Sequence, residues 1–158
     1  MRSLRSHHRN KKDRTMILES AILCLALNIY HESRSEMIPG QYAVAHVTLN
    51  RAGSQEKVCE TVVAKHQFSW TTKLLTKRGK RYVLKEDGLP RDERAWRLAK
   101  HIAAYTLKNK PSDITRGATF YHTTAVDPHW RTSMVKVAKI GRHIFYKQAR
   151  SEEHTSEL

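Results

Sequence analysis

The stretch that decides the fold is residues 27–51, LNIYHESRSEMIPGQYAVAHVTLNR. It begins in an apolar segment, passes through the polar sequence 31–36, and ends in a run rich in alanine, valine and leucine. Pro39 fits the first turn of a helix, and Gly53 follows the run where a helix would stop. The stretch therefore predicts two largely buried helices joined by a short polar turn.

The helix before this turn is predicted over residues 16–30. Its apolar side chains recur at the spacing of one helical face and are Leu18, Ile22, Leu25 and Ile29. The second helix is predicted over 41–51, and a short third helix over 56–65.

Residues 66–90 are predicted to form a long loop, which starts with the aromatic cluster QFSW at 67–70 and then becomes basic. Long loops in compact domains are often functional. Pro90 and Asp92 predict the start of a further helix, which ends near Asn109. Its buried face is expected to consist of Ala95, Leu98, Ile102 and Tyr105.

The last third of the chain changes to a β pattern. Strand-forming residues occur at 118–123, and 135–140 alternates apolar and polar side chains. A Gly-Arg turn then leads into 143–147, so these last two segments are expected to form a hairpin. The predicted class is therefore α+β and mainly α, with four helices followed by a small C-terminal antiparallel β element.

The net charge is +14 over 158 residues. Residues 1–15 contribute +5 and residues 150–158 contribute −2, which leaves +11 for residues 16–149. A domain this basic attracts a polyanion, such as nucleic acid, an anionic membrane or a cell wall with acidic polymers. The sequence has no apolar run of about 18 residues, so no membrane span is expected.

We place the domain at 16–149, because the residues before and after this range do not look like part of it. Residues 1–15 are basic and polar and are interpreted as an arm or as residues before a true start at Met16. A secretion signal continuing into the first helix is the weaker interpretation, because Glu19 interrupts its apolar region. Residues 150–158, RSEEHTSEL, resemble the translation of a short-read sequencing adapter and are excluded from the fold.

The two cysteines are Cys24 and Cys59. Neither stands at a metal-ligand or redox spacing. Both have apolar neighbours, so we predict that they are buried thiols that act as small hydrophobic side chains. A disulfide between them is the alternative, because pairing depends on a closeness of the Cα atoms that the sequence does not reveal.

The first candidate for chemistry is Glu32, in the sequence YHESRSE at 30–36. A carboxyl group at the end of a buried helix beside Tyr30 is partly desolvated, and desolvation raises a carboxyl pKa. A general acid for glycosidic cleavage needs such a raised pKa, because it must carry a proton to the leaving oxygen. The alternative is a surface glutamate that pairs with Arg34 or caps a helix.

The QFSW cluster at 67–70 is a candidate for sugar binding. The rings of Phe68 and Trp70 could stack on sugar faces, while Gln67 and Ser69 could hydrogen-bond hydroxyl groups. The alternative is that both rings belong to the hydrophobic core.

The segment GATFYHTTAVDPHW at 117–130 places three polar residues, Tyr121, His122 and Thr123, after a strand. Histidines are numerous in the chain, but none shows His-x-x-x-His spacing and no Cys-x-x-Cys is present. The sequence therefore predicts no metal site and no cofactor. It also lacks the Gly-x-Ser-x-Gly motif of serine hydrolases.

Six ordered segments resemble the SleB-type cell wall hydrolase family. They are residues 27–51, Val58-Cys59, QFSW at 67–70, GATFYHTT at 117–124, Pro128 with Trp130, and IGRHIFY at 140–146. The resemblance spans residues 18–147. It implies a lysozyme-like, mainly helical fold with a small β element, shared by spore cortex-lytic enzymes and phage endolysins.

The resemblance also implies roles for single residues. The first glutamate of the family motif is catalytic and corresponds to Glu32. With the residues singled out above, the expected substrate-binding set is Glu36, Gln41, Gln67, Phe68, Ser69, Trp70, Tyr121, His122 and Thr123. Four positions depart from the family pattern, which has Ala, Gly, His and Asn at Ser33, Ser35, Phe120 and Asp127.

The activity that the resemblance implies is cleavage of the β-1,4 bond between N-acetylmuramic acid and N-acetylglucosamine in peptidoglycan. None of Glu36, Asp92 and Asp127 is a compelling second carboxylate, so a lytic transglycosylase with one catalytic Glu is favoured over a muramidase. A zinc-dependent N-acetylmuramoyl-L-alanine amidase and a basic nucleic-acid-binding module are the alternatives.

The expected partners are peptidoglycan glycan strands and, through charge, anionic wall polymers rather than nucleic acid. A monomer is expected. The enzyme would act on the bacterial cell wall. Because no convincing signal peptide is present, synthesis in the cytoplasm and release through a holin pore fit best.

Overall fold

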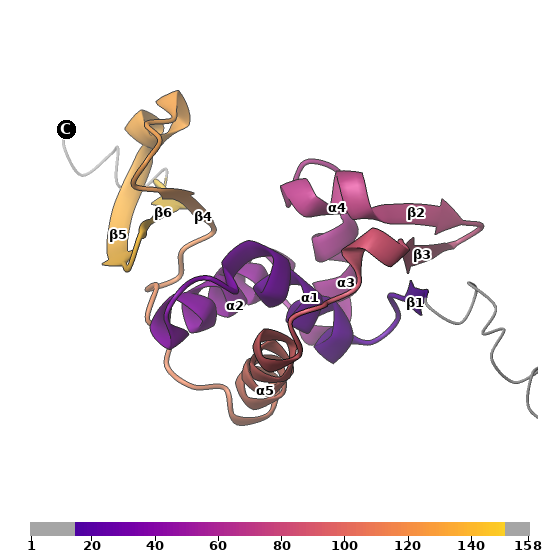
Figure 1. Cartoon of the computed structure of the whole chain (residues 1–158). Coiled ribbons are helices and arrows are strands. Elements are labelled where there is room, and N and C mark those ends of the chain that lie inside the picture. The colour runs from indigo at the N-terminus through magenta and orange to yellow at the C-terminus, as the bar shows by residue number, and fades with distance from the viewer. Residues whose placement is uncertain (1–14, 151–158) are drawn as a thin grey trace, which may run out of the picture.

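The computed structural model describes residues 15–150. The predictions for the arm up to residue 14 and for the tail 151–158 lie outside the described residues. Between these ends the chain forms helices and two small antiparallel sheets (Figure 1). The predicted mainly helical α+β class is therefore confirmed.

The described part contains five α-helices. They are α1 (Ala21–Ser33), α2 (Ile38–Ala52), α3 (Val58–Val63), α4 (Ser69–Leu74) and α5 (Glu93–Asn109). One sheet has the order β1-β3-β2, with β1 (Met16–Ile17), β2 (Leu75–Arg78) and β3 (Arg81–Leu84). The other has the order β4-β6-β5, with β4 (Phe120–Thr123), β5 (Met134–Ile140) and β6 (His143–Gln148).

The first helix begins at Ala21 rather than at residue 16, so the predicted start is wrong. Ser20 caps the helix, because its hydroxyl accepts a hydrogen bond from the Leu23 amide at 3.1 Å. Met16 instead pairs with Leu84 in the β1–β3 ladder. The apolar residues before Ser20 therefore extend a sheet and not the helix.

The second helix, predicted over 41–51, runs from Ile38 to Ala52 and so begins three residues earlier than predicted. Pro39 lies in its first turn, and Gly53 ends it with a positive φ of 76°, a conformation that glycine adopts without strain. A buried hydrogen bond of 2.9 Å from the Asn28 amide to the Thr48 hydroxyl joins α2 to α1. These two helices form the centre of the core.

The prediction of a long loop over 66–90 is wrong. The segment contains α4, the β2–β3 hairpin and a 3-10 turn at Glu86–Gly88. The hairpin reverses at Gly79, whose φ is 63°. Basic side chains of this segment, such as Lys77 and Arg81, lie on strands β2 and β3, where they interrupt the alternation of apolar and polar residues that indicates strands.

The last helix, α5, begins at Glu93, directly after its N-cap residue Asp92, close to the predicted start; the Asp92 carboxylate accepts a hydrogen bond from the Ala95 amide at 3.0 Å. Its buried face is rotated from the predicted one. The buried residues are Ala99, Ile102, Ala103, Thr106 and Leu107. Tyr105 is 43% exposed and packs edge-on against Tyr42 at the rim of the core, so its predicted burial is wrong.

The predicted buried thiols are in fact a disulfide between Cys24 and Cys59. The packing of α3 against α1 brings the two Cα atoms to 5.2 Å, within the range that a disulfide needs. This closeness arises from tertiary packing, which sequence spacing does not encode. The bond ties α1 to the start of α3.

The predicted C-terminal hairpin is confirmed in strands β5 and β6, which reverse at Gly141. Strand β4 pairs with β6, so that Tyr121 lies opposite Phe145. Phe145 is fully buried and packs with Ala43 and Val47 of α2. One face of this sheet is thus attached to the helical core through α2.

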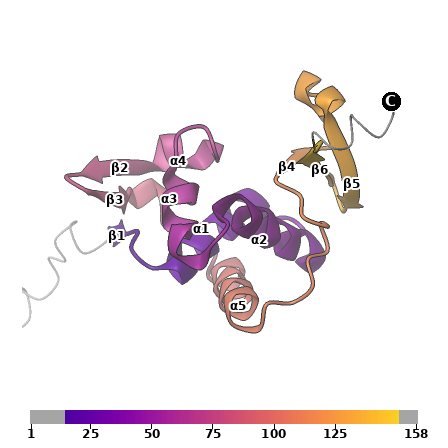
Figure 2. The same cartoon turned by 180° about the vertical axis from the view of Figure 1, so that it is seen from behind.

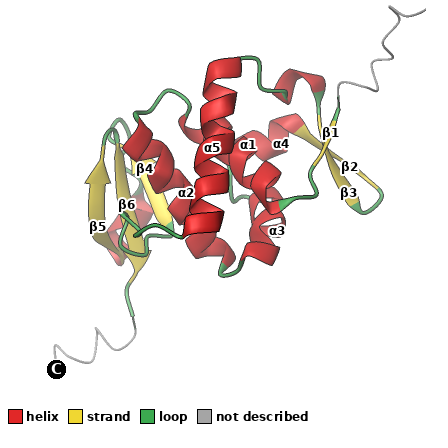
Figure 3. Cartoon of the chain, turned by 90° about the horizontal axis from the view of Figure 1, so that it is seen from below, coloured by secondary structure: helices red, strands yellow, loops and turns green. Residues whose placement is uncertain are grey.

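The two sheets lie at opposite ends of the helical part, as Figures 1 and 2 show from opposite sides. The view from below in Figure 3 shows the same order, with α2, α5 and α1 between the sheets. None of the helices in residues 15–150 is both long and apolar enough to span a membrane.

Candidate active site

Glu32 lies in the last turn of α1 and is half-buried. Burial raises the pKa of its carboxyl group above the ordinary value, while a hydrogen bond from the Tyr121 side chain and the charge of Arg51 partly offset the rise. The group therefore holds its proton to a higher pH than a surface glutamate does. This is the property that a general acid requires.

Tyr121 reaches Glu32 from strand β4. Its ring packs against His143 at 5.1 Å and Phe145 at 5.6 Å between centroids, on the sheet face that meets α2. Burial, together with the charge of Glu32, raises the pKa of Tyr121 well above its usual range. The phenol thus stays protonated and donates its hydrogen bond to the Glu32 carboxyl.

Arg51 is the third residue of the group formed with Glu32 and Tyr121. The sequence did not lead us to predict it. It lies in the last turn of α2, and burial lowers the pKa of its guanidinium while Tyr121 and Glu32 raise it. Its Nη1 donates to the Gln67 carbonyl at 3.1 Å, and its Nε donates to the Thr119 carbonyl. The only sequence signal was its place at the end of the decisive stretch 27–51.

The same guanidinium lies over two aromatic rings. Its Cζ is 4.7 Å from the centroid of Phe68 and 5.6 Å from that of Phe120. These rings come from opposite sides, Phe68 from the α3–α4 connection and Phe120 from β4. Arg51 therefore holds the helical part and the C-terminal sheet together beside Glu32.

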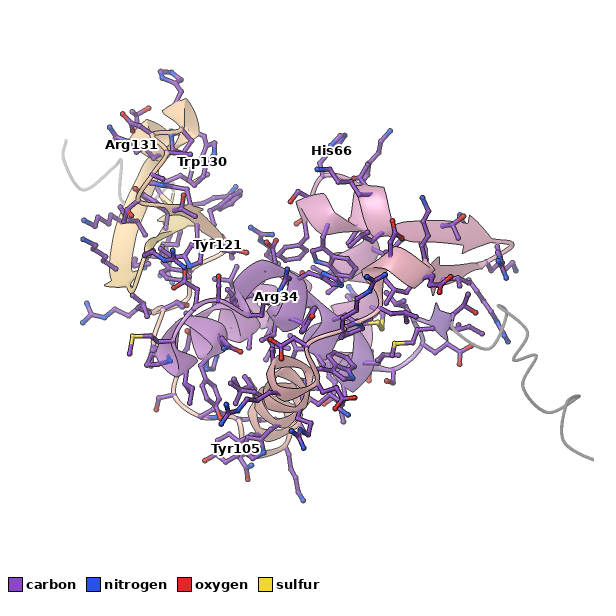
Figure 4. All side chains as sticks on the ribbon, viewed as in Figure 1. Arg34, His66, Tyr105, Tyr121, Trp130 and Arg131 are labelled. Carbon is purple, nitrogen blue, oxygen red and sulfur yellow. A yellow bond between two sulfur atoms is a disulfide. The ribbon has the colours of Figure 1, made fainter. Side chains whose placement is uncertain are left out.

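A hollow of 330 Å³ opens next to these residues. Its lining residues are Arg51, His66, Gln67, Thr119, Phe120, Tyr121 and Trp130. Figure 4 shows Tyr121 and Trp130 on the side of the β4–β6 sheet and His66 on the side of α4. The hollow thus lies between the two parts that Arg51 joins, and its lining combines aromatic rings with polar groups, as in sites that bind small ligands.

The QFSW cluster divides between this hollow and the core. Gln67 lines the hollow and Ser69 is exposed. Phe68 and Trp70 are buried, and the Trp70 indole donates to the Asn28 amide oxygen at 2.8 Å. The two rings therefore belong to the hydrophobic core, in the same cluster as the buried side chains of α1.

Glu36 lies in the turn between α1 and α2, and Gln41 lies in the first turn of α2. The Glu36 carboxylate is 3.4 Å from Nε of Arg142 and 3.7 Å from Nδ1 of His143. The Gln41 amide donates to the Glu36 carbonyl at 3.1 Å. Both residues line a second hollow near the start of α5, and the structure does not bring them to the hollow beside Arg51.

Comparison with known proteins shows the family of this chain. The family described as Cell Wall Hydrolase matches residues 35–146. This chain belongs to the cell wall hydrolase family. The match begins at Ser35, so the place of Glu32 rests on the structure described above.

Two solved structures resemble this cell wall hydrolase. One is the catalytic domain of the Bacillus cereus SleB protein, with 26% identity and a TM-score of 0.57 over 80% of this chain and 89% of that chain. The other is the catalytic domain of the germination-specific lytic transglycosylase SleB from Bacillus anthracis, with 27% identity and the same TM-score over 80% of this chain and 93% of that chain. No curated protein matches the sequence.

These likenesses confirm the predicted resemblance to SleB-type hydrolases and the lysozyme-like fold. The cell wall hydrolase keeps the helices and the small C-terminal sheet that the resemblance implied.

His122 and Thr123 of the hydrolase lie apart from Glu32. The His122 ring is buried on the outer face of the sheet, where Nε2 is 2.8 Å from the Tyr146 hydroxyl and Nδ1 is 2.8 Å from the Thr123 carbonyl. Trp130 packs edge-on against this pair. His122 therefore has a structural role here: it contacts Tyr146 of β6 and packs against Trp130, which lines the hollow.

Within residues 15–150 of the hydrolase, no group of three His, Cys, Asp or Glu side chains could hold a metal ion. His122 and His143 lie in aromatic contacts, and His66, which lines the hollow, is exposed. The described part thus supplies no ligand set for the zinc that the amidase alternative requires.

Proposed function

We propose that this cell wall hydrolase degrades peptidoglycan by cutting its glycan strand, with Glu32 as the single catalytic acid and base of a lytic transglycosylase. The observation that carries the proposal is the half-buried Glu32, with a raised pKa, beside a hollow lined by aromatic and polar groups. The likeness to a catalytic domain named as a germination-specific lytic transglycosylase supports it.

The first step is proton transfer from the Glu32 carboxyl to the glycosidic oxygen. The bond between this oxygen and C1 of N-acetylmuramic acid breaks, and positive charge develops on the sugar ring as the alcohol leaves. The Glu32 carboxylate that remains lies beside the Tyr121 hydroxyl and Arg51, which both stabilise its negative charge. Tyr121 and Arg51 thus stabilise the ionised form of Glu32, which is the form present after proton donation.

The second step returns the proton. The Glu32 carboxylate accepts the proton of the sugar's own C6 hydroxyl as the C6 oxygen bonds to C1, which gives a 1,6-anhydro product and restores the Glu32 acid. Because Glu32 gives up one proton and takes back another, the two steps need no second carboxylate. Attack by water in place of the C6 hydroxyl would give a reducing end, which is the muramidase alternative.

The other candidate carboxylates already have partners. Glu36 interacts with Arg142 and His143, and Asp92 caps α5. Asp127 forms an ion pair with Arg131 on the exposed turn after β4. These pairings give each of the three carboxylates a structural role away from Glu32, which supports the route with one carboxylate.

The test is digestion of purified peptidoglycan by the intact chain and by Glu32→Gln, with mass spectrometry of the soluble products. We expect anhydro-muropeptides from the native enzyme and none from the variant. Glu93→Gln is the matched control, because Glu93 is an exposed glutamate at the start of α5.

Other products would contradict the proposal in distinct ways. Reducing-end sugars would indicate hydrolysis by water. Free stem peptides that disappear on addition of a chelator would indicate an amidase. Glycan cleavage that persists in Glu32→Gln would remove Glu32 from the mechanism, and steeply salt-dependent DNA binding without lysis would favour a nucleic-acid-binding module.

A further inference from the structure

A second hollow, of 480 Å³, lies between the α1–α2 turn and the start of α5. Its charged lining residues are Arg34, Arg94, Glu36 and Asp92, and the exposed apolar side chains of Met37 and Ile38 form another part of its wall. The proposed mechanism uses none of these six residues.

The carboxylates of this hollow are engaged, whereas the guanidinium groups are not. Glu36 lies within 3.4 Å of Arg142, and Asp92 accepts the hydrogen bond that caps α5. Arg34 lies over the Tyr30 ring at 5.0 Å, and both Arg34 and Arg94 are exposed. Among residues 15–150, neither arginine forms an ion pair.

Contacts connect this hollow to the proposed catalytic acid. Arg34 follows Glu32 by two residues, at the end of α1. On the other side, Tyr121 is hydrogen-bonded to Glu32 and packs against His143 at 5.1 Å, and His143 lies 3.7 Å from Glu36. Figure 4 shows Arg34 near the centre of the molecule, with Tyr121 toward the upper left. The second hollow is therefore connected to Glu32 through a short series of residue contacts.

We propose that this hollow is the subsite for the peptide stem that N-acetylmuramic acid carries, and that Arg34 and Arg94 bind the free carboxylates of the stem. The inference rests on the proposed function and deepens it. A guanidinium pairs with a carboxylate through two parallel hydrogen bonds, so two unpaired arginines suit an acidic peptide better than a neutral sugar. Met37 and Ile38, 79% and 52% exposed, offer apolar contacts for alanine methyl groups of the stem.

The experiment measures binding without turnover, with Glu32→Gln as the background. Calorimetric titration compares a peptidoglycan tetrasaccharide that carries its peptide stems with the same tetrasaccharide after removal of the stems. We expect binding of the peptide-bearing ligand to be about tenfold tighter, as two exposed charge pairs allow. The substitutions Arg34→Gln and Arg94→Gln together should reduce this preference to about onefold, and Arg34→Lys with Arg94→Lys should restore part of it.

The control pair is Arg97→Gln with Lys108→Gln, which removes the same charge from exposed positions of α5 outside the hollow. Equal binding of the two ligands by the background protein would overturn the inference. So would an equal loss of preference in the control pair, because the effect would then come from net charge. Circular dichroism verifies that each variant is folded.

The two proposals fail in different ways. If the native chain cleaves no glycan but the peptide preference depends on Arg34 and Arg94, the proposed cleavage fails and the subsite remains. If glycan is cleaved and no preference exists, only the subsite fails.

Discussion

The Tyr121 hydroxyl donates a hydrogen bond to the Glu32 carboxyl, and this contact connects the C-terminal sheet to the last turn of α1. Burial favours the protonated form of Glu32, and the Tyr121 hydrogen bond favours the ionised form. The proton affinity of the proposed acid is therefore set by two parts of the fold that are distant in sequence.

Replacement of Tyr121 by phenylalanine should shift the pH range of activity. The variant loses a hydrogen bond that stabilises ionised Glu32, so the pKa of Glu32 rises further. A general acid works while protonated, and its activity falls as the pH rises through its pKa. We expect the alkaline limb of the pH–rate profile to move up by about one unit, the equivalent of one hydrogen bond to a charged group. The measurement is the initial rate of glycan cleavage between pH 4 and 9.

Tyr105→Phe is the control for this profile, because Tyr105 is a partly exposed tyrosine that packs against Tyr42 on the far side of the core. Its profile should match that of the native enzyme. A profile for Tyr121→Phe that stays in place would show that the hydrogen bond does not govern the titration that limits the rate.

Replacement of Arg51 by methionine should reduce both stability and activity. The guanidinium donates to the carbonyls of Thr119 and Gln67, and it lies over the Phe68 ring. Loss of these donors leaves the partly buried Thr119 carbonyl without its partner, while water can hydrate the exposed Gln67 carbonyl, so we expect a cost of about 1–3 kcal/mol in the free energy of unfolding. Urea denaturation measures this loss, and the same preparation gives the rate of cleavage.

The lysine variant at position 51 separates charge from geometry. Arg51→Lys keeps the positive charge near Glu32 but loses the planar fork that reaches two carbonyls. We expect a pH–rate profile near the native one and a stability close to that of Arg51→Met. A lysine variant with native stability would contradict the bridging role, and Arg97→Lys on the exposed face of α5 is the control.

The sequence predicted those parts of the site that lie within one helix. Helical periodicity and a polar turn placed Glu32 at the end of a buried helix, and the resemblance to SleB-type hydrolases then implied that it is the catalytic glutamate. Its contacts with Tyr121 and Arg51 depend on how β4 and α2 pack against α1, and spacing along the chain contains no record of that packing. Arg51 was overlooked for this reason, although it stood in the stretch that decided the fold.

The errors in the fold have local physical causes. The β2–β3 hairpin was taken for a loop because basic residues such as Lys77 and Arg81 interrupt the alternation of a half-buried strand. The proximity of Cys24 and Cys59 follows from the contact between α1 and α3. Tyr105 was placed in the core because the apolar spacing of α5 fits two neighbouring helix faces. The face that is actually buried is rotated slightly about the helix axis and excludes Tyr105.

Removal of the disulfide should lower stability without removing the fold. The bond closes a loop with a sequence separation of 35 residues, for which the loss of chain entropy predicts a stabilisation of about 3–4 kcal/mol. We expect Cys24→Ala with Cys59→Ala to lower the free energy of unfolding by about this amount in urea. Addition of a reductant should destabilise the native protein in the same way and leave the double variant unchanged. Equal stability with and without reductant would show that the bond contributes nothing.

Asp113 should make the stability of the protein depend on pH in the acidic range. Burial alone would raise the pKa of Asp113, but hydrogen bonds from Thr115, Asn50 and the Gly117 amide outweigh it and hold the pKa below its usual value. A depressed carboxyl pKa stabilises the fold fully above the unfolded value of about 3.9, and this contribution is lost as the pH falls through the folded-state pKa. The nearby His46 Nδ1, at 3.9 Å, has its pKa lowered by burial and therefore stays neutral at neutral pH.

Asp113→Asn tests this account because it removes the titrating group from the loop that leads into β4. The difference in free energy of unfolding between the native protein and the variant should narrow as the pH falls below about 3.9 and close only below the lower folded-state pKa, since protonated aspartic acid and asparagine are both neutral. At pH 7 the variant should be less stable by about 2–4 kcal/mol, because a neutral amide replaces an acceptor of several hydrogen bonds. The exposed Asp87→Asn is the control, and it should follow the native curve. A gap between native protein and Asp113→Asn that is the same at pH 3 and pH 7 would show that ionisation of Asp113 has no part in it.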